Sequence, residues 1–507
     1  MAALCRLAGG FSIDSDNNTS SSDTKHTRGP SPKELDAIEL QDHGKLAQKT
    51  SSDEPVSPAS IYTPGRKHDP FKTPEVSKTP NELESSQPPT PTRQTAASVV
   101  PSWSYPRMNK WRILCACLIY FGNGMSDSAP GALIPYIETW YSIGYAIVSL
   151  IWIANAAGFI TAAFVTDPIL KKFGRARTLM GSEAFMIAAY VIISCTPPFP
   201  AVVVAYLIMG FGNAINLALN NVFCANLADS TVILGLAHGS YGVGGIVAPL
   251  IATAMVSNGI HWSRFFLITI GVRAVGLVFA GWSFWNYEKE GTTQFANSLQ
   301  QLATRQNGEV TKRHLLSRAL KNKTTLIGAL FIFAYQGAEV SESGWFISYL
   351  INYRNGNPAR VGYVTSGFWA GITLGRFTLT HVAHRIGEKR FVFAMGIGVI
   401  IFQLMCWFIP NIIGEAVSVA ILGLLLGPVY PCAATVFTKL LPGNMQTIAI
   451  SFISSAGSSG GAVVPFITGL IAQGAGTFVL HPICIGAYVL MLGCWVVLPK
   501  VKKRAED

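Results

Sequence analysis

Two stretches of the chain decide how it folds: GFITAAFVTDPILKKFGRAR at residues 158–177 and GITLGRFTLTHVAHRIGEKR at residues 371–390. A glycine, a phenylalanine, a second glycine and an arginine recur at matching places in both, always 213 positions apart. Each stretch begins apolar and ends in a cluster of Lys and Arg, the pattern of a membrane helix that runs into a cytosolic loop. The chain therefore contains a duplicated membrane unit.

Matching residues recur elsewhere at the same or nearly the same offset, which extends the duplication over most of the chain. GGIVAP at residues 244–249 matches GGAVVP at residues 460–465, 216 positions later. Further glycine pairs lie 213 positions apart: Gly124 with Gly337, Gly131 with Gly344, and Gly210 with Gly423. Self-similarity at one offset indicates internal repeats. We predict two related halves that run in the same direction.

Composition excludes most soluble functions. Hydrophobic residues make up 50% of the 507 residues, charged residues only 13%, and the mean hydropathy is +0.36, whereas soluble proteins carry about 25% charged residues. No GxxxxGK[ST] loop and no grouped nucleophile, base and oxyanion donors appear, so we expect no enzyme. The net charge of +11 comes from short clusters between apolar runs, which argues against a nucleic-acid partner. The nine cysteines stand singly, so we expect no metal and no cofactor.

Apolar segments of about 20 residues, the length that crosses a bilayer as a helix, recur from Trp111 onward. We predict six in each half, at residues 111–137, 146–165, 178–195, 201–226, 231–256, 263–286, 324–350, 361–380, 391–409, 412–437, 447–472 and 478–498. The resulting plan is a disordered cytoplasmic tail at 1–106, a first half at 107–286, a linker at 287–323, a second half at 324–499 and a short cytoplasmic tail at 500–507.

Lys and Arg gather in the linker and in alternate short loops, which places both termini on the cytosolic side of the lipid bilayer. The N-terminal tail is rich in Ser, Thr, Pro and charge, a composition typical of disorder. Six of its Ser and Thr residues precede proline and are candidate substrates of kinases: Ser31, Ser57, Thr63, Thr73, Thr79 and Thr90. The plasma membrane is the favoured location, with vacuolar, peroxisomal or other internal membranes as alternatives.

Two parallel six-helix halves are typical of the major facilitator architecture, whose substrate site lies between the halves near mid-membrane. The loop KKFGRAR at 171–177 resembles the signature of that superfamily between its second and third helices, and HRIGEKR at 384–390 resembles the second-half copy. The resemblance implies an all-α polytopic membrane protein with twelve transmembrane helices in two pseudo-repeats. The family's Asp falls at Lys171 here, and the nearest acid is Asp167.

Within the superfamily, YQGAE at residues 335–339, with Trp345 and Tyr349, resembles the seventh helix of the fucose and glucose symporter-like branch and its fungal relatives. The resemblance implies that the two loops control gating. The candidate gating residues are Asp167, Lys171, Gly174, Arg175, Arg177, Arg376, Arg385 and Gly387.

Ionisable residues inside membrane helices are costly and usually functional. Asp127 interrupts the first helix, and we consider a substrate or proton role against a structural role at the break Ala129-Pro130-Gly131. Glu339 and Glu342 lie three residues apart on the seventh helix. We favour Glu339 as the proton or polar substrate site and place Glu342 near the outer mouth.

Asn213, Asn216 and Asn220 form a polar stripe on the fourth helix. The stripe suits a hydroxylated or zwitterionic solute, or else holds the bundle together through amide hydrogen bonds. Arg273 interrupts the sixth helix, where pairing with an acid of the first half is favoured over anion binding.

His238 and Tyr241 precede the glycines of the fifth helix, where a histidine near a cavity can titrate. Trp345 and Tyr430 could stack on a sugar ring or serve only packing.

The sequence thus predicts a secondary active transporter of a small organic solute, a sugar or another metabolite, that works by alternating access and is coupled to protons. Efflux of a metabolite or drug is one alternative, and a non-transporting membrane nutrient sensor is another.

Overall fold

The computed structural model describes residues 101–290, 312–442 and 445–499. All of them belong to one compact unit, residues 89–507. The kinase candidates and most of the tail that we predicted to be disordered lie outside the described residues. Residues 101–106, which we assigned to that tail, are held by hydrogen bonds from the Asn109 side chain to the carbonyls of Ser102, at 2.8 Å, and Tyr105, at 3.1 Å.

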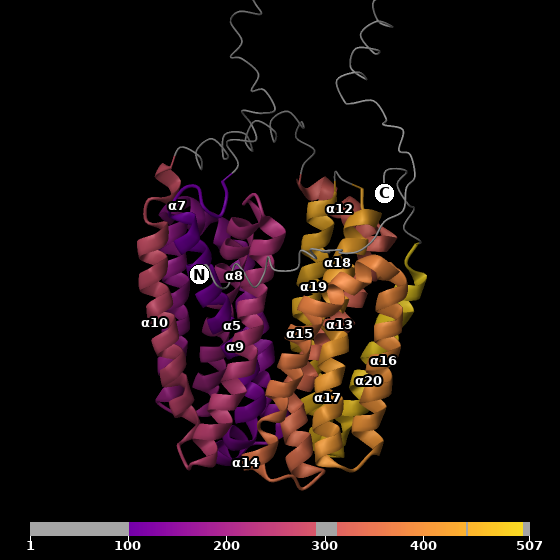
Figure 1. Ribbon diagram of the computed structural model, residues 1–507. Coiled ribbons are helices and arrows are strands. Elements are labelled where there is room, and N and C mark those ends of the chain that lie inside the picture. Colours follow the sequence, from indigo (N-terminus) through magenta and orange to yellow (C-terminus); the bar gives the residue numbers. More distant parts are fainter. Residues whose placement is uncertain (1–100, 291–311, 443–444, 500–507) are drawn as a thin grey trace, which may run out of the picture. The chain divides into compact units, whose positions relative to one another are not determined.

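The first half is built from long helices joined by short turns. Its elements are α5 (Asn109–Tyr141), α6 (Tyr145–Val148), α7 (Leu150–Ser194), α8 (Phe199–Ala225), α9 (Ser230–Ser257), η1 (Trp262–Arg264), α10 (Phe265–Phe284) and η2 (Tyr287–Lys289). Figure 1 shows these helices side by side, coloured from indigo to magenta.

The second half repeats this plan and is coloured from orange to yellow in Figure 1. Its elements are α12 (Lys312–Lys321), α13 (Lys323–Asn352), α14 (Pro358–Val361), α15 (Val364–Ile386), α16 (Glu388–Phe408), α17 (Ile412–Leu426), α18 (Val429–Leu440), α19 (Gln446–Ala475), η3 (Thr477–Val479) and α20 (Leu480–Val497).

Twelve helices in the described residues are long enough to cross a bilayer. Eight segments qualify by both length and apolar composition. One of these, Tyr145–Ser194, contains two crossings, and the helices α5, α13 and α15, with 33, 30 and 23 residues, are also long enough to cross. These last three carry Asp127, Glu339 and Arg376, whereas Arg273 lies on α10, inside a segment that does qualify.

The chain reverses direction inside α7 at a single residue. Gly174 has φ 75° and ψ 171°, a conformation that is essentially restricted to glycine. Gly158 before the kink and Ser182 after it both contact the middle of α8, against Leu207 and Gly212 respectively. The loop that we predicted at 166–177 is therefore helical up to the kink, because one glycine suffices for the turn. Gly387, with φ 97°, joins α15 to α16 in the same way.

The duplicated glycines mark equivalent helix contacts in the two halves. A side-chain carbon at Gly158 would overlap the carbonyl oxygen of Leu207, and one at Gly371 would overlap that of Ala420. Both the glycines and their partners are 213 positions apart. The repeat therefore preserves the places where small residues allow two backbones to approach closely.

The two halves meet chiefly where α5 packs on α13, α9 on α15, and α6 and α7 on α19. Near the α14 end, the ring of Trp345 lies 5.2 Å from that of Trp152 and 5.7 Å from that of Tyr145. The indole nitrogen of Trp345 donates to the carbonyl of Pro465 at 2.8 Å. Trp345 therefore packs between the halves.

Gly174→Ala is expected to lower stability by about 1–3 kcal/mol, because a side chain disfavours this backbone conformation. The thermal unfolding midpoint of the purified protein in detergent measures the effect. Gly181→Ala is the matched control, since Gly181 lies in the same helix with nothing within 4 Å of an added carbon. An equal fall in both variants would contradict the conformational explanation.

Candidate functional site

Asp127 lies near the middle of α5 and is half-buried. The Tyr241 hydroxyl on α9 donates to Asp127 Oδ2 at 2.8 Å. Gly124 makes this possible, because an added carbon there would overlap the Tyr241 carbonyl oxygen and force α5 and α9 apart. Asp127 has no hydrogen bond or ion pair with a cation among the described residues, so one neutral hydroxyl supports its carboxyl group.

The second half also holds a carboxylate inside a membrane helix, and there Glu339 forms an ion pair with Arg376. Arg376 Nη2 on α15 lies 3.3 Å from Glu339 Oε1 on α13, and the two side chains are 25% and 7% exposed. We had expected Arg376 to join the loop network. It lies instead nearly three turns from Gly387 at the end of α15, where its long side chain can reach the carboxylate of α13.

Trp369 connects the two carboxyl sites. Its indole nitrogen donates to Ser343 Oγ at 2.9 Å, and its ring centre lies 5.9 Å from that of Tyr241. Ser343 follows Glu339 by one helical turn. A chain of contacts thus runs from Asp127 through Tyr241 and Trp369 into α13, across the boundary between the halves.

Aromatic and hydroxyl groups continue from this site toward α18 and α19. Tyr335 lies one turn before Glu339, and its ring centre is 6.0 Å from that of Tyr430. The Tyr430 hydroxyl lies 3.4 Å from Ser454 Oγ. Several serines of α19 are exposed although they stand inside a membrane-length helix: Ser451, Ser455, Ser458 and Ser459. Such a surface can stack a ring and hydrogen-bond its hydroxyl groups.

Arg273 belongs to a buried network inside the first half. Arg273 Nη1 lies 3.3 Å from Glu183 Oε2, and both side chains are at most 1% exposed. Asn216 donates to Glu183 at 2.8 Å and accepts from Asn123 at 3.0 Å. This is the pairing within the first half that we favoured for Arg273.

The asparagine stripe lies in the interior of the first half. Asn213, Asn216 and Asn220 are all at most 3% exposed. Asn216 joins α8 to α5 and α7, while both polar side-chain atoms of Asn220 are without a partner. The spacing put the three amides on one face, but it could not say which neighbours that face contacts.

Glu342 does not lie at the outer mouth, where we had placed it. It is 1% exposed and accepts a hydrogen bond from Gln403 on α16. Gln403 Nε2 in turn lies 2.8 Å from His481 Nδ1 on α20. Three residues along a helix leave two side chains about 60° apart around its axis, and here Glu342 faces α16 and α20 while Glu339 faces α15.

His238 lies one turn before Tyr241 on α9 and is exposed. Its ring packs edge-on against Tyr120, with ring centres 5.1 Å apart. Tyr120 donates to Asn221. His238 therefore lies beside the site without touching either carboxylate in the hydrogen bonds described.

The first signature loop is held by an acid that we did not single out. The backbone nitrogen of Arg175 donates to Glu288 Oε1 at 2.5 Å, just after the kink at Gly174. The Arg175 side chain donates to the Leu219 carbonyl at 2.6 Å and lies over the Tyr287 ring. Glu288 thus supplies a carboxylate beside the loop whose signature Asp is replaced by Lys171.

The other gating candidates lie at the same end. Arg177 stacks over Trp285, with 5.7 Å from its guanidinium carbon to the ring centre. Asp167, Lys171 and Arg385 are exposed. In the second half, Glu388 follows Gly387 and pairs with Lys439 at 3.0 Å.

Sequence reasoning missed Ser343, Glu288 and Gln403. Ser343 lies one turn from Glu339, so the helical period could have indicated it. Glu288 and Gln403 act across long sequence separations, and nothing in their local sequence marks them. Within the described residues, no group of three or more His, Cys, Asp and Glu side chains could hold a metal ion.

Comparison with known proteins gives matches that extend over both halves of the chain. Residues 116–355 and 343–507 match the Major Facilitator Superfamily model. The chain is 26% identical to Bypass of stop codon protein 6 of Saccharomyces cerevisiae, over 77% of this chain and 83% of that protein. It is 21% identical to the glucose/mannose transporter GlcP of Bacillus subtilis, over 69% and 85%.

Solved structures share the fold at low sequence identity. A D-xylose-proton symporter superposes with a TM-score of 0.63 at 14% identity, covering 77% of this chain and 98% of that one. The nucleoside transporter NupG superposes with a TM-score of 0.61, also at 14% identity, covering 76% and 99%. The predicted all-helical plan of two six-helix halves is confirmed.

Proposed function

The chain belongs to the major facilitator superfamily and is a multi-pass secondary transporter of small solutes rather than an enzyme; we propose that it carries a sugar or similar hydroxylated metabolite by alternating access and that protons drive it. The observation that supports this most is the pair of acidic sites, half-buried Asp127 with Tyr241 and buried Glu339 with Arg376, on opposite halves of the bundle.

Proton coupling in this proposal uses the different partners of the two carboxyl groups. Asp127 is supported by one neutral hydroxyl, so it can take up a proton without leaving a buried cation unpaired. Glu339 is tied to the fixed charge of Arg376. A proton that reaches Glu339 weakens this pair and frees Arg376 donors for solute hydroxyls. Rocking of the halves then exposes both groups to the other side.

A sugar-like solute fits the groups around the two sites. Tyr430 offers a half-buried ring that packs on Tyr335, and Arg376 and the serines of α19 offer hydrogen bonds. GlcP, a relative, is a glucose/mannose transporter, and one structure with this fold is a D-xylose-proton symporter. These similarities support a sugar-like solute, and the Lys and Arg of the linker and alternate loops support an orientation with both termini in the cytosol.

Proteoliposomes that contain the full chain test the proposal. Uptake of labelled hexoses, pentoses, hexuronates and nucleosides is measured with and without an inward proton gradient. We expect one class to accumulate only with the gradient and to stop accumulating when a protonophore is added. Solute binding without flux above that of empty liposomes would instead indicate a sensor.

Alternating access requires the α14 end of the boundary between the halves to open. Gln473 Oε1 on α19 accepts from the Ala146 backbone nitrogen at 3.3 Å, and an added carbon at Gly144 would touch the same side chain. A cysteine pair, Gly144→Cys with Gln473→Cys, is expected to cut uptake about tenfold or more when cross-linked, because it joins the halves. Reduction should restore uptake, and each single variant is the control. Full uptake by the cross-linked protein would contradict rocking at this boundary.

A further inference from the structure

A groove of about 870 Å³ lies between α15 and α17 on the second half, away from the two carboxyl sites. Its floor consists of small residues where the two helices pack backbone to backbone. An added carbon at Gly371 would overlap the Ala420 carbonyl oxygen, and one at Gly375 would overlap that of Leu424. Because the residues along the contact line of α15 and α17 are small, no large side chains fill the space over that line, and an open channel remains there.

The walls of the groove are aliphatic and exposed. Ile413 is 77% exposed, Val417 55% and Leu374 54%. The principal contacts of α17 are with α15 and α16, which leaves the groove open on its outer side. At the depth of a membrane helix, the medium on that side is lipid.

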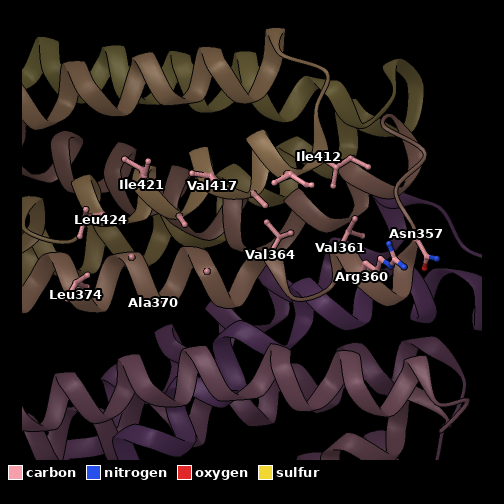
Figure 2. Close-up of a pocket in the computed structure, with 15 residues that line it drawn as sticks. Asn357, Arg360, Val361, Val364, Ala370, Leu374, Ile412, Val417, Ile421 and Leu424 are labelled. Carbon is pink, nitrogen blue, oxygen red and sulfur yellow. The ribbon is translucent and has the colours of Figure 1, made fainter.

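The groove has one polar end. Figure 2 shows Asn357 and Arg360 together at one end and Leu374 and Leu424 at the other. Arg360 is exposed, and its guanidinium group has no hydrogen bond or ion pair in the described part of the chain. It is thus an unpaired cation at the mouth of an apolar channel, at the end of the bundle opposite to α12 (Figure 1).

We propose that this groove binds a glycerophospholipid of the leaflet at the α14 end, with an acyl chain between α15 and α17 and the phosphate group on Arg360. Charge complementarity selects the headgroup, since a guanidinium group matches phosphate geometry through paired N–H donors. The aliphatic walls suit the chain and offer little to a polar solute.

The length of the groove agrees with one leaflet. Leu374 follows Arg360 by 14 positions, most of them within α15, and at the rise of a helix these positions span at most about 21 Å. Half the thickness of a bilayer with its headgroups is about 20–22 Å. A lipid with its phosphate at Arg360 therefore ends its chain near Leu374, at the middle of the membrane.

Native mass spectrometry of the delipidated full chain, titrated with phosphatidylglycerol, tests this site. Arg360→Gln is expected to weaken binding of the tightest lipid about tenfold, the effect of losing one charge-assisted interaction. Ala370→Phe should weaken it to a similar degree, because a ring on the groove floor fills the channel. Both variants keep the residues of the transport site.

Two variants control for charge and for added bulk. Arg264→Gln removes an exposed cation at the same end of the first half, and Val278→Phe adds a ring to the exposed face of α10. Both should bind phosphatidylglycerol as the wild type does. Wild-type binding by Arg360→Gln or by Ala370→Phe would overturn the proposal, as would an equal loss in the controls. Loss in Ala370→Phe alone would indicate an apolar occupant such as a sterol.

Discussion

Glu339→Gln is expected to reduce proton-driven uptake about 100-fold, to the level of empty liposomes. The substitution removes the negative charge that pairs with Arg376, whose guanidinium nitrogen lies 3.3 Å from Glu339 Oε1. Leaving one member of such a pair without its partner costs about 3–5 kcal/mol, and the neutral amide can no longer exchange a proton. Initial uptake rates in proteoliposomes at equal protein content measure the loss.

Glu342→Gln is the matched control for this experiment. Glu342 lies on the same helix but faces Gln403, and it has no ion pair among the described residues. An amide at position 342 can still accept the hydrogen bond from Gln403, so we expect uptake within about threefold of wild type. If Glu342→Gln stopped uptake and Glu339→Gln did not, the carboxyl groups would be assigned to the wrong roles.

Glu183→Gln is expected to destabilise the protein by about 3–5 kcal/mol, because Arg273 would keep its charge in a buried site without a carboxylate. The guanidinium group of Arg273 would then face only neutral acceptors, among them Ser126 Oγ, at 3.0 Å, and the Ile119 carbonyl, at 3.5 Å. The thermal unfolding midpoint and the yield of monodisperse protein in detergent measure this effect.

A double variant, Glu183→Gln with Arg273→Met, separates the charge from the packing. We expect it to recover most of the lost stability, since a buried pair can often be replaced by apolar groups at little cost. Glu290→Gln is the mild control, because Arg112 keeps the Ser283 carbonyl and Asn109 Oδ1 as acceptors. A double variant as unstable as the single one would show that shape, not charge, is what Glu183 provides.

The architecture could be predicted from the sequence because the two duplicated halves carry matching residues at a fixed offset. Gly158 and Gly371 are conspicuous at a fixed offset, and the structure shows both pressed against a carbonyl oxygen of the next helix. Close backbone approach requires glycine whatever the surrounding side chains are. Hydropathy then predicted the number of membrane crossings, although charged and polar residues lower the hydropathy of three of them.

The side-chain partners could not be read in the same way. Glu339 and Glu342 stand three residues apart, and the helical period places them on one side of α13. Yet Glu339 faces Arg376 and Glu342 faces Gln403. Which partner each acid has depends on the rotation of α13 within its bundle. The same limit applies to Asn216, whose stripe was evident but whose partner, Glu183, lies on another helix.

Solute-induced proton movement tests the proposed coupling through Asp127 and Glu339. Proteoliposomes with a pH-sensitive dye inside are given the transported sugar without an imposed gradient. We predict that wild type acidifies the interior as sugar enters, and that Asp127→Asn exchanges labelled for unlabelled sugar without acidification. Acidification by Asp127→Asn and Glu339→Gln at the wild-type rate would contradict coupling through these two carboxyl groups.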